Sequence, residues 1–568
     1  MTEKRDSVIN KHSWLCSVAV NAAILAAVML FTDIIYETND DFAIALELAA
    51  GYPHVGFVNY FLCKALAAVQ GLTSGVNVFI LSQLTASFLA FTTLLGILFR
   101  RSSYITENIL AAAVTLFFAL DHYCSVQFTK TSALLMAAGL VLVADTYIHS
   151  RKILPYILGF AQFFIGVMYR QNGMFPALAY VAVFMLIWWI FGKGEVFKEK
   201  GIAREILTVA CILVLMIAPY GLDKLSDMMN AGTPELALFR EYQSERARVT
   251  DYPLLGNYEK NADKYEEAGL IWEDLYLVDR FILDYDGAAS LENLKTINEI
   301  NWPDVKGNIT PVFAFKRFLL RSYEAVKNQS FMGMHIVILI LISVYFAVSR
   351  KPRFWIYVIA AGMLTAAVYS AIYYMQRPQY RAFYVADISA AYWLLYALTE
   401  SEPAKHRKIG AAVCLIAALV TGAFFFPAAN RLVAQQVYIN SLIEPAEMTE
   451  YISSHPDNFY VVPTSDMKQP VSYLKPLQYP TQLPNEAGTG GWETLSPYKL
   501  ELLDRYGIGN PVKDILDNPD AYLIGDYKKG MLIDYYNRWY GDENTEIVFE
   551  KADEVAGNNV YRIVSRTL

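Results

Sequence analysis

Two adjacent carboxylates, Asp40 and Asp41, follow directly on the first apolar segment of the chain. A carboxylate can deprotonate a substrate hydroxyl, and two together can hold a divalent cation. At the end of a membrane span, such a pair is either a solvated helix exit or the reactive centre of an enzyme that works at the membrane face. The spans and loops around the pair indicate which of these two roles it has.

The composition is that of a membrane protein. Of 568 residues, 55% are hydrophobic and 14% aromatic, and the mean hydropathy is +0.28, which exceeds the balance of a soluble domain. The net charge of −8 and the lack of a basic stripe exclude a nucleic-acid-binding protein. The five cysteines show no CxxC or Cys/His spacing, which argues against a zinc site or a disulfide framework.

Eleven apolar segments are candidate membrane spans, because each approaches the length needed to cross a hydrocarbon core. No cleavage site follows the first of them, so it is expected to be retained. The predicted spans are 14–35, 76–99, 107–121, 130–148, 153–169, 174–192, 205–221, 333–349, 354–374, 382–398 and 409–427.

Lysine and arginine alternate between the two sides of these spans. With a cytoplasmic N-terminus, each short inner loop carries basic residues, as at Arg100-Arg101, Arg151-Lys152 and Arg350-Lys351. The outer short loops hold few, so the positive-inside rule is satisfied at every turn. We therefore expect a multi-pass plasma-membrane protein with a cytoplasmic N-terminus, an exterior C-terminus, and Asp40 and Asp41 on the exterior face.

The exterior segments suggest two domains, a transmembrane domain at 1–430 and a soluble α/β domain at 431–568. The first includes the exterior loop 33–75, with short interfacial helices at 42–50 and 57–70, and the large exterior loop 223–332, helical in part at 259–270. In the second, helical and strand patterns alternate. The helices are expected at 444–454 and 529–540, and the strands at 459–462, 521–524, 546–549 and 560–564.

Several arginines also lie on the exterior side. Arg377 and Arg381 stand within five residues of each other, and Arg170 is beside Gln171. Guanidinium groups suit a phosphate because each donates two parallel hydrogen bonds. The alternative for Arg377 and Arg381 is an ion pair with Asp40, Asp41 or the acidic outer loop.

Three further exterior residues are candidates for substrate contacts. Lys130 either receives a phosphate or extends from a span end to the interface. His122 is either a surface histidine or a substrate-binding group, and Tyr380 lies between Arg377 and Arg381. No P-loop, GxSxG, HExxH or EF-hand pattern is present, and Gly488-Thr-Gly-Gly-Trp492 lacks the strand–turn–helix context of a phosphate loop.

The arrangement resembles the GT-C superfamily of polytopic membrane glycosyltransferases. Asn39-Asp40-Asp41 matches the acidic pair of that family's first exterior loop, and 42–50 and 57–70 match its two interfacial helices. The stretches 127–133 (QFTKTSA) and 169–171 (YRQ) look like those of bacterial transferases that decorate surface polysaccharides. The resemblance implies transfer from a polyprenyl-phosphate-linked sugar to a glycan or lipid acceptor at the exterior leaflet.

In that reading, Asp40 or Asp41 is the base, and Arg170, Arg377, Arg381 and Lys130 receive the donor phosphate. His122, Gln171 and Tyr380 contact substrate. No cofactor is required, although the acidic pair could hold Mg²⁺ or Mn²⁺. An enzyme of this kind needs an aspartate of the pair and at least one exterior arginine to line one cavity. The alternatives are a lipid or oligosaccharide flippase or transporter, and a non-catalytic surface-assembly protein.

Overall fold

The computed structural model describes residues 8–150, 152–200, 202–252, 255, 258–307, 309–404, 407–516 and 518–567. Contacts between Cα atoms divide the chain into two compact units. The helical unit comprises Met1–Asp227, Pro311–Tyr438 and Lys475–Tyr479, and the sheet unit comprises Met228–Thr310, Ile439–Leu474 and Pro480–Leu568. These bounds differ from the division at 430/431, since most of the large loop belongs with the C-terminal segment.

The helical unit is a bundle of long apolar helices. Its elements are α1 (Val8–Lys11), α2 (Ser13–Phe31), β1 (Ile35–Tyr36), α3 (Asn39–Ala49), α4 (Tyr60–Gln70), α5 (Val78–Arg101), α6 (Ile105–Cys124), β2 (Ser125–Val126), α7 (Phe128–Asp145), α8 (Ile153–Tyr169), α9 (Met174–Lys200), α10 (Ile202–Met229), α15 (Pro311–Lys327), α16 (Phe331–Ser349), α17 (Ile356–Tyr374), α18 (Tyr380–Glu400), α19 (Arg407–Ala423) and α20 (Phe425–Ser441).

Ten helices in the described part of the chain are long and apolar enough to cross a membrane, so the prediction of a polytopic helical membrane protein is confirmed. Each predicted span falls on a helix. The count differs by one because 153–169 forms α8, an apolar helix of only 17 residues, whereas α19 continues with α20 in one apolar stretch, Ile409–Ser441. The predicted interfacial segments are also helical, as α3 and α4.

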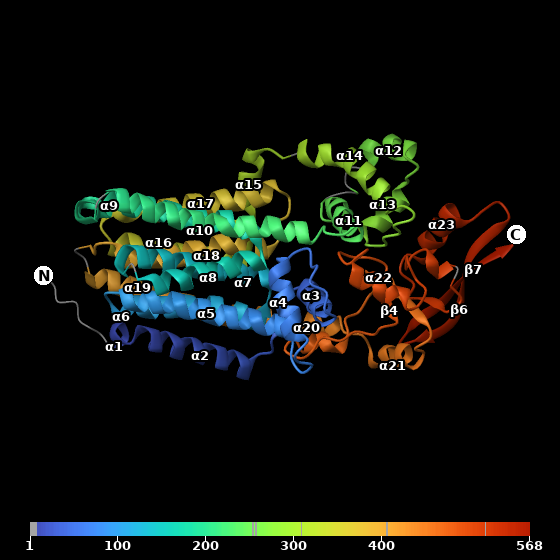
Figure 1. The fold of residues 1–568 in the computed structure, drawn as a ribbon, viewed down its shortest axis with the longest axis horizontal. Helices are drawn as coiled ribbons and strands as arrows, with labels where there is room; N and C mark the ends of the chain where they lie inside the picture. Colours follow the sequence, from blue (N-terminus) through green and yellow to red (C-terminus); the bar gives the residue numbers. More distant parts are fainter. Residues whose placement is uncertain are drawn as a thin grey trace. The chain divides into compact units, whose positions relative to one another are not determined.

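The centre of the bundle is formed by α7, which packs against α5, α8 and α18 (Figure 1). Its span is 94% buried, whereas that of α2 is only 22% buried and faces outward. Small residues allow α7 and α8 to approach closely, as in many membrane helix pairs. A Cβ atom at Gly139 would overlap the carbonyl oxygen of Gly159. A larger residue at this crossing would therefore push the two helices apart.

The sheet unit is built around a five-stranded mixed sheet of order β4-β3-β5-β7-β6. The strands β3, β4 and β5 are parallel, and β6 and β7 form an antiparallel hairpin. The elements are α11 (Pro234–Thr250), α12 (Tyr258–Glu267), α13 (Trp272–Asp279), α14 (Leu291–Gly307), α21 (Ala446–Ser454), β3 (Phe459–Val462), β4 (Glu486–Gly488), α22 (Pro497–Asp504), β5 (Ala521–Ile524), α23 (Lys529–Tyr540), β6 (Thr545–Val555) and β7 (Asn558–Thr567).

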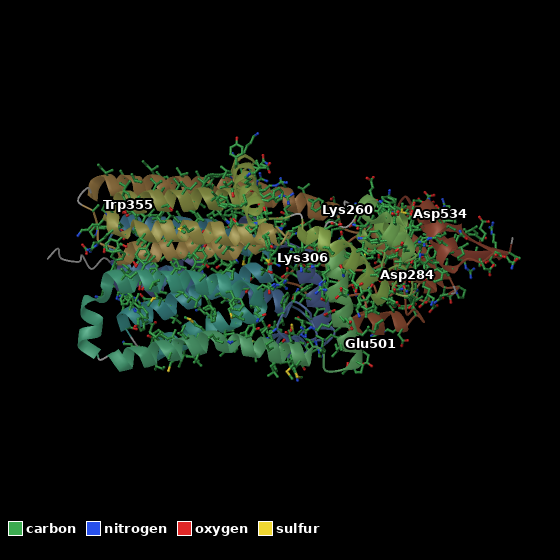
Figure 2. The ribbon with its side chains drawn as sticks, turned by 90° about the horizontal axis from the view of Figure 1, so that it is seen from above. Lys260, Asp284, Lys306, Trp355, Glu501 and Asp534 are labelled. Carbon is green, nitrogen blue, oxygen red and sulfur yellow. The ribbon has the colours of Figure 1, made fainter. Side chains whose placement is uncertain are left out.

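The predicted strands and helices of 431–568 all occur, and the structure adds β4 and α22, which were not expected. One core joins this sheet to the helices of the large loop, because Leu275 and Leu294 pack in the same cluster as Leu523 and Ile563. Asp284, labelled in Figure 2, connects the two segments through polar contacts: its carboxylate accepts hydrogen bonds from the Tyr535 hydroxyl (2.7 Å) and the Asn510 amide (2.8 Å).

Candidate active site

The acidic pair begins helix α3, where Asp40 and Asp41 occupy the first turn. This position is favourable for carboxylates because the free backbone N–H groups of a helix start carry partial positive charge. The helix is turned so that the two side chains differ in access. The Asp41 side chain is fully buried, whereas that of Asp40 is 20% exposed.

A short parallel strand pair places this helix against the next polar segment of the chain. Ile35 of β1 pairs with Ser125 of β2, and the Glu37 backbone N–H donates to the Val126 carbonyl (3.1 Å). The segments leading out of α2 and α6 are thereby joined. This junction positions Asp41 beside the first residue of α7.

Two donors hold one oxygen of Asp41. Oδ1 accepts hydrogen bonds from Gln83 Nε2 on α5 and from the Phe128 backbone N–H, both at 3.0 Å. Oδ2 is buried and has no hydrogen-bond partner in the described part of the structure. Burial raises the pKa of Asp41 to about 8, and the neighbouring charge of Asp40 acts in the same direction. Burial therefore favours the protonated form of Asp41.

Asp40 instead faces a cation. Arg381 Nη2, at the start of α18, donates to Asp40 Oδ2 at 3.3 Å, and both side chains are partly exposed. The ion-pair alternative for Arg381 is thus realised in this structure. The contact is long and the two side chains are 27% and 20% exposed, so solvent screens it in part and a phosphate can compete with Asp40 for Arg381.

Lys130 is buried between two carboxylates. Its Nζ atom lies 2.6 Å from Glu37 Oε2 and 3.0 Å from Asp121 Oδ2, and the Tyr380 hydroxyl donates to the same Asp121 oxygen (3.1 Å). Burial raises the pKa of Glu37, and the positive charge of Lys130 opposes that rise. The role of Glu37 was not expected from the sequence. A lysine at a span end calls for a carboxylate partner, and Lys130 has two, Asp121 and Glu37.

Arg170 lines a cavity of about 230 Å³ at the end of α8. Its guanidinium lies over the rings of Phe57 and Phe128 and donates to the Phe57 carbonyl at 3.5 Å. Burial, together with the positive charges of Arg381 and Arg377, lowers the pKa of Arg170 to about 10. The three arginines are thus close enough to repel one another. The cavity lining also includes Asn59, Gln171, Asn172, Asp223 and Asp227.

The remaining predicted residues lie apart from this cavity. His122 is buried among rings of the bundle, including Phe91 and Tyr384, with Ser87 Oγ at 3.4 Å from Nδ1. Tyr380 lines a second cavity, of about 450 Å³, whose walls also include Tyr373, Phe383 and Arg431. The linings of these two cavities do not contain Asp40 or Asp41. Neither of these two cavities therefore combines an aspartate of the pair with an arginine, as was expected of an enzyme, and the contact between the two groups is the direct Asp40–Arg381 pair.

A divalent cation would find few protein ligands here. No group of three or more His, Cys, Asp or Glu side chains that could hold a metal ion occurs in the described ranges. Asp40 faces Arg381, and one oxygen of Asp41 accepts two hydrogen bonds. A cation held by this pair would need further oxygens from phosphate or water.

The fold and this site define a multi-pass helical membrane protein with an acidic pair, a cluster of arginines and a sheet-containing C-terminal region. No family model and no curated protein matches the sequence. Among solved structures, the chain is similar to the crystal structure of ArnT from Cupriavidus metallidurans in the apo state, at 12% identity and a TM-score of 0.38, over 97% of this chain and 98% of that chain.

Proposed function

We propose that the chain is a GT-C-type membrane glycosyltransferase that transfers a sugar from a polyprenyl-phosphate donor to a cell-surface glycan or lipid acceptor at the exterior leaflet. The observation that carries the proposal is the pairing of Asp40 with Arg381, next to the buried Asp41. Arg170 and Arg377 belong to the same electrostatic cluster. A carboxylate beside several guanidinium groups is the arrangement that a transfer from a sugar phosphate needs.

Asp40 is the proposed base. In an inverting transfer, the acceptor oxygen forms a bond to the anomeric carbon, its proton passes to the carboxylate, and the bond from that carbon to the phosphate oxygen breaks. Asp40 is the member of the pair that an acceptor hydroxyl can reach, since Asp41 is fully buried. Asp41 positions the start of α3 through its bonds to Gln83 and Phe128.

The arginines are the proposed receivers of the leaving polyprenyl phosphate. Arg381 can exchange Asp40 for a phosphate, which is the stronger partner because a guanidinium binds it through two parallel bonds. That exchange would also release the Asp40 carboxylate for proton transfer. Arg170 is held in place by two aromatic rings, and Gln171 on the same cavity can contact sugar hydroxyls.

Lys130 has a supporting role in this proposal. Its ammonium is matched by Glu37 and Asp121, so it holds the junction of the first two polar segments rather than a phosphate. Tyr380 is fixed by its bond to Asp121 and leads directly to Arg381. The ion cluster of Lys130, Glu37 and Asp121 therefore sets, through Tyr380, the position of Arg381 relative to Asp40.

The test is a transfer assay on the full chain in lipid nanodiscs, with a panel of polyprenyl-phosphate sugars, for Asp40→Asn and Asp41→Asn. We expect Asp40→Asn to lower the rate about 10²–10⁴-fold, while Glu501→Gln on the exposed surface of α22 leaves it unchanged. A wild-type rate in Asp40→Asn would overturn the assignment of the base. Loss of transfer in a folded Asp41→Asn alone would move that role to Asp41. The same assay with a chelator tests whether a divalent cation takes part.

A further inference from the structure

Helix α15 carries an apolar stripe that the protein does not cover. Its only buried residue is Ala314, although the helix packs on α16 and α17. The exposed apolar residues Leu319 (52%) and Tyr323 (67%) lie one turn apart. Residues three and four apart share a helix face, so the spacing makes one continuous stripe. The stripe consists of Val312, Phe315, Leu319, Tyr323 and Val326, while Phe313 and Leu320, also exposed, stand about 100–120° from Leu319 around the helix axis.

A basic face lies across the helix from this stripe. Arg317 and Arg321 stand about 160° from Leu319 around the helix axis, at 3.6 residues per turn. Lys316 and Lys327 flank the stripe, and all four basic side chains are exposed. Glu324 is the one acidic residue of α15 and pairs with Arg321 at 2.7 Å. The helix is therefore cationic as well as amphipathic.

The third face fixes α15 against the ends of two spans. The ring of Phe318 meets that of Tyr369, five residues before the end of α17, with centroids 5.5 Å apart. The turn into α16 is tight, since a Cβ at Gly333 would overlap the Ala325 backbone. Arg431 of α20 donates to the carbonyls of Asn328 and Gln329 in that turn. The helix is thus held at the end of α17 and the start of α16, which are the ends of two candidate spans.

We propose that α15 is an interfacial helix that binds anionic phospholipid head groups. At this depth the stripe faces acyl chains, and Lys316, Arg317 and Arg321 reach the phosphates beside them. Amphipathic helices with aromatic and aliphatic residues on one face and Lys or Arg on the other bind anionic bilayers in this way. The proposal is independent of the proposed transferase activity, because α15 contributes no residue to the Asp40 site.

The first test measures lipid selectivity. The full chain is placed in nanodiscs of mixed phosphatidylglycerol and phosphatidylcholine, and the lipids that remain bound are counted by native mass spectrometry. We expect the preference for phosphatidylglycerol to fall about fivefold for each basic residue removed, hence about a hundredfold in a triple variant, and to weaken with salt. The test variant is Lys316→Gln/Arg317→Gln/Arg321→Gln, and the matched control, on the β6–β7 hairpin, is Lys551→Gln/Arg562→Gln/Arg566→Gln.

The second test locates the stripe. A nitroxide is attached at Leu319→Cys or Arg317→Cys in a Cys16→Ser/Cys211→Ser background. We expect the first label to be relaxed mainly by oxygen, which concentrates in hydrocarbon, and the second by a water-soluble nickel chelate. Water access at Leu319, or protection of that label from both agents by a protein partner or a second copy, would overturn the proposal. Unchanged lipid selectivity in the triple variant would do the same.

Discussion

Buried carboxyl groups at the two ends of the helical unit differ in how many of their oxygens have hydrogen-bond partners. Near the junction of α16 and α17, where Figure 2 labels Trp355, both oxygens of Glu107 are satisfied: one meets Arg350 and the Tyr345 hydroxyl, and the other accepts from Ser102 Oγ (2.8 Å) and the Ser103 N–H (3.2 Å). At the acidic-pair end, Asp41 Oδ2 has no partner within the described residues.

This difference separates structural charge from charge that is available to a ligand. A buried ion pair with all its hydrogen bonds made holds helices together and has nothing left to offer. The Asp40–Arg381 contact is partly exposed, long and close to a second arginine. We therefore expect substitutions at the Glu107 end to change stability and those at the Asp40 end to change activity.

Arg350→Ala is expected to have the largest effect on stability. The Glu107 carboxylate would stay buried without its cation, which destabilises a protein by about 3–5 kcal/mol. We expect that loss in the free energy of unfolding in mixed micelles, with an unchanged transfer rate per folded molecule. Arg353→Ala is the matched control, because its pair with Glu402 is exposed and contributes little. Equal effects of the two variants would contradict a structural role for Glu107–Arg350.

Lys130→Met tests whether a buried charge can support both the stability of the fold and the transfer activity. Removing Lys130 leaves Glu37 and Asp121 without their cation, and we expect a cost of about 3 kcal/mol, because part of the penalty is relieved when a carboxyl takes up a proton. Unlike Arg350→Ala, this change should also lower transfer, since Tyr380 and Arg381 lose their support. Lys64→Met, at an exposed lysine of α4, is the control. A stable variant with normal transfer would show that Lys130 positions nothing.

Local patterns were sufficient to predict most elements of both units. Hydropathy and charge alternation marked the spans, and the strands at 459–462 and 521–524 occur at the predicted bounds. The assignment of the large loop was different, because it depends on packing between distant segments. Leu275 and Leu294 share a core with Leu523, more than two hundred positions later, and no pattern within 223–332 specifies that partner.

The sequence predicted which residues belong to the site better than it predicted which of them contact one another. Asp40 and Arg381 were both candidates, and their pairing was one of two alternatives. Glu37 was missed, since a glutamate at the end of a span has the same local pattern as a solvated residue. The difference in burial between Asp40 and Asp41 depends on how α3 rests on α5 and α7, which adjacent positions in a sequence do not reveal.

The raised pKa of Asp41 predicts that the stability of the folded protein depends on pH. The protonated carboxyl is favoured in the folded state, so stability should fall as pH rises from the unfolded value near 3.8 towards about 8. The expected slope is at most about 1.4 kcal/mol per pH unit. Asp41→Asn cannot ionise and should remove this part of the decline between pH 5 and 7. Parallel stability curves for the two proteins would show that Asp41 is ionised already at acidic pH.

The smallest effect is expected in the sheet unit, where the carboxyls of Glu444 and Glu486 face each other and the charge of Lys499 offsets only part of the rise in the Glu486 pKa. Burial and the charge of its partner raise the pKa of Glu486, and burial raises that of Glu444, whose Oε2 accepts from Thr449 Oγ1 at 2.6 Å. The pair thus holds a proton that the unfolded chain releases near pH 4.5, and stability should fall as pH rises above that value.

Glu486→Gln removes the repulsion and should raise the free energy of unfolding by about 1 kcal/mol at pH 8, with little change at pH 5. The measurement is chemical unfolding at both pH values, with Glu447→Gln on the exposed face of α21 as the control. An equal gain at pH 5 would mean that the glutamine acts by packing and not by charge. A charge effect would identify a third arrangement, in which a shared proton takes the place that a cation fills at Glu107.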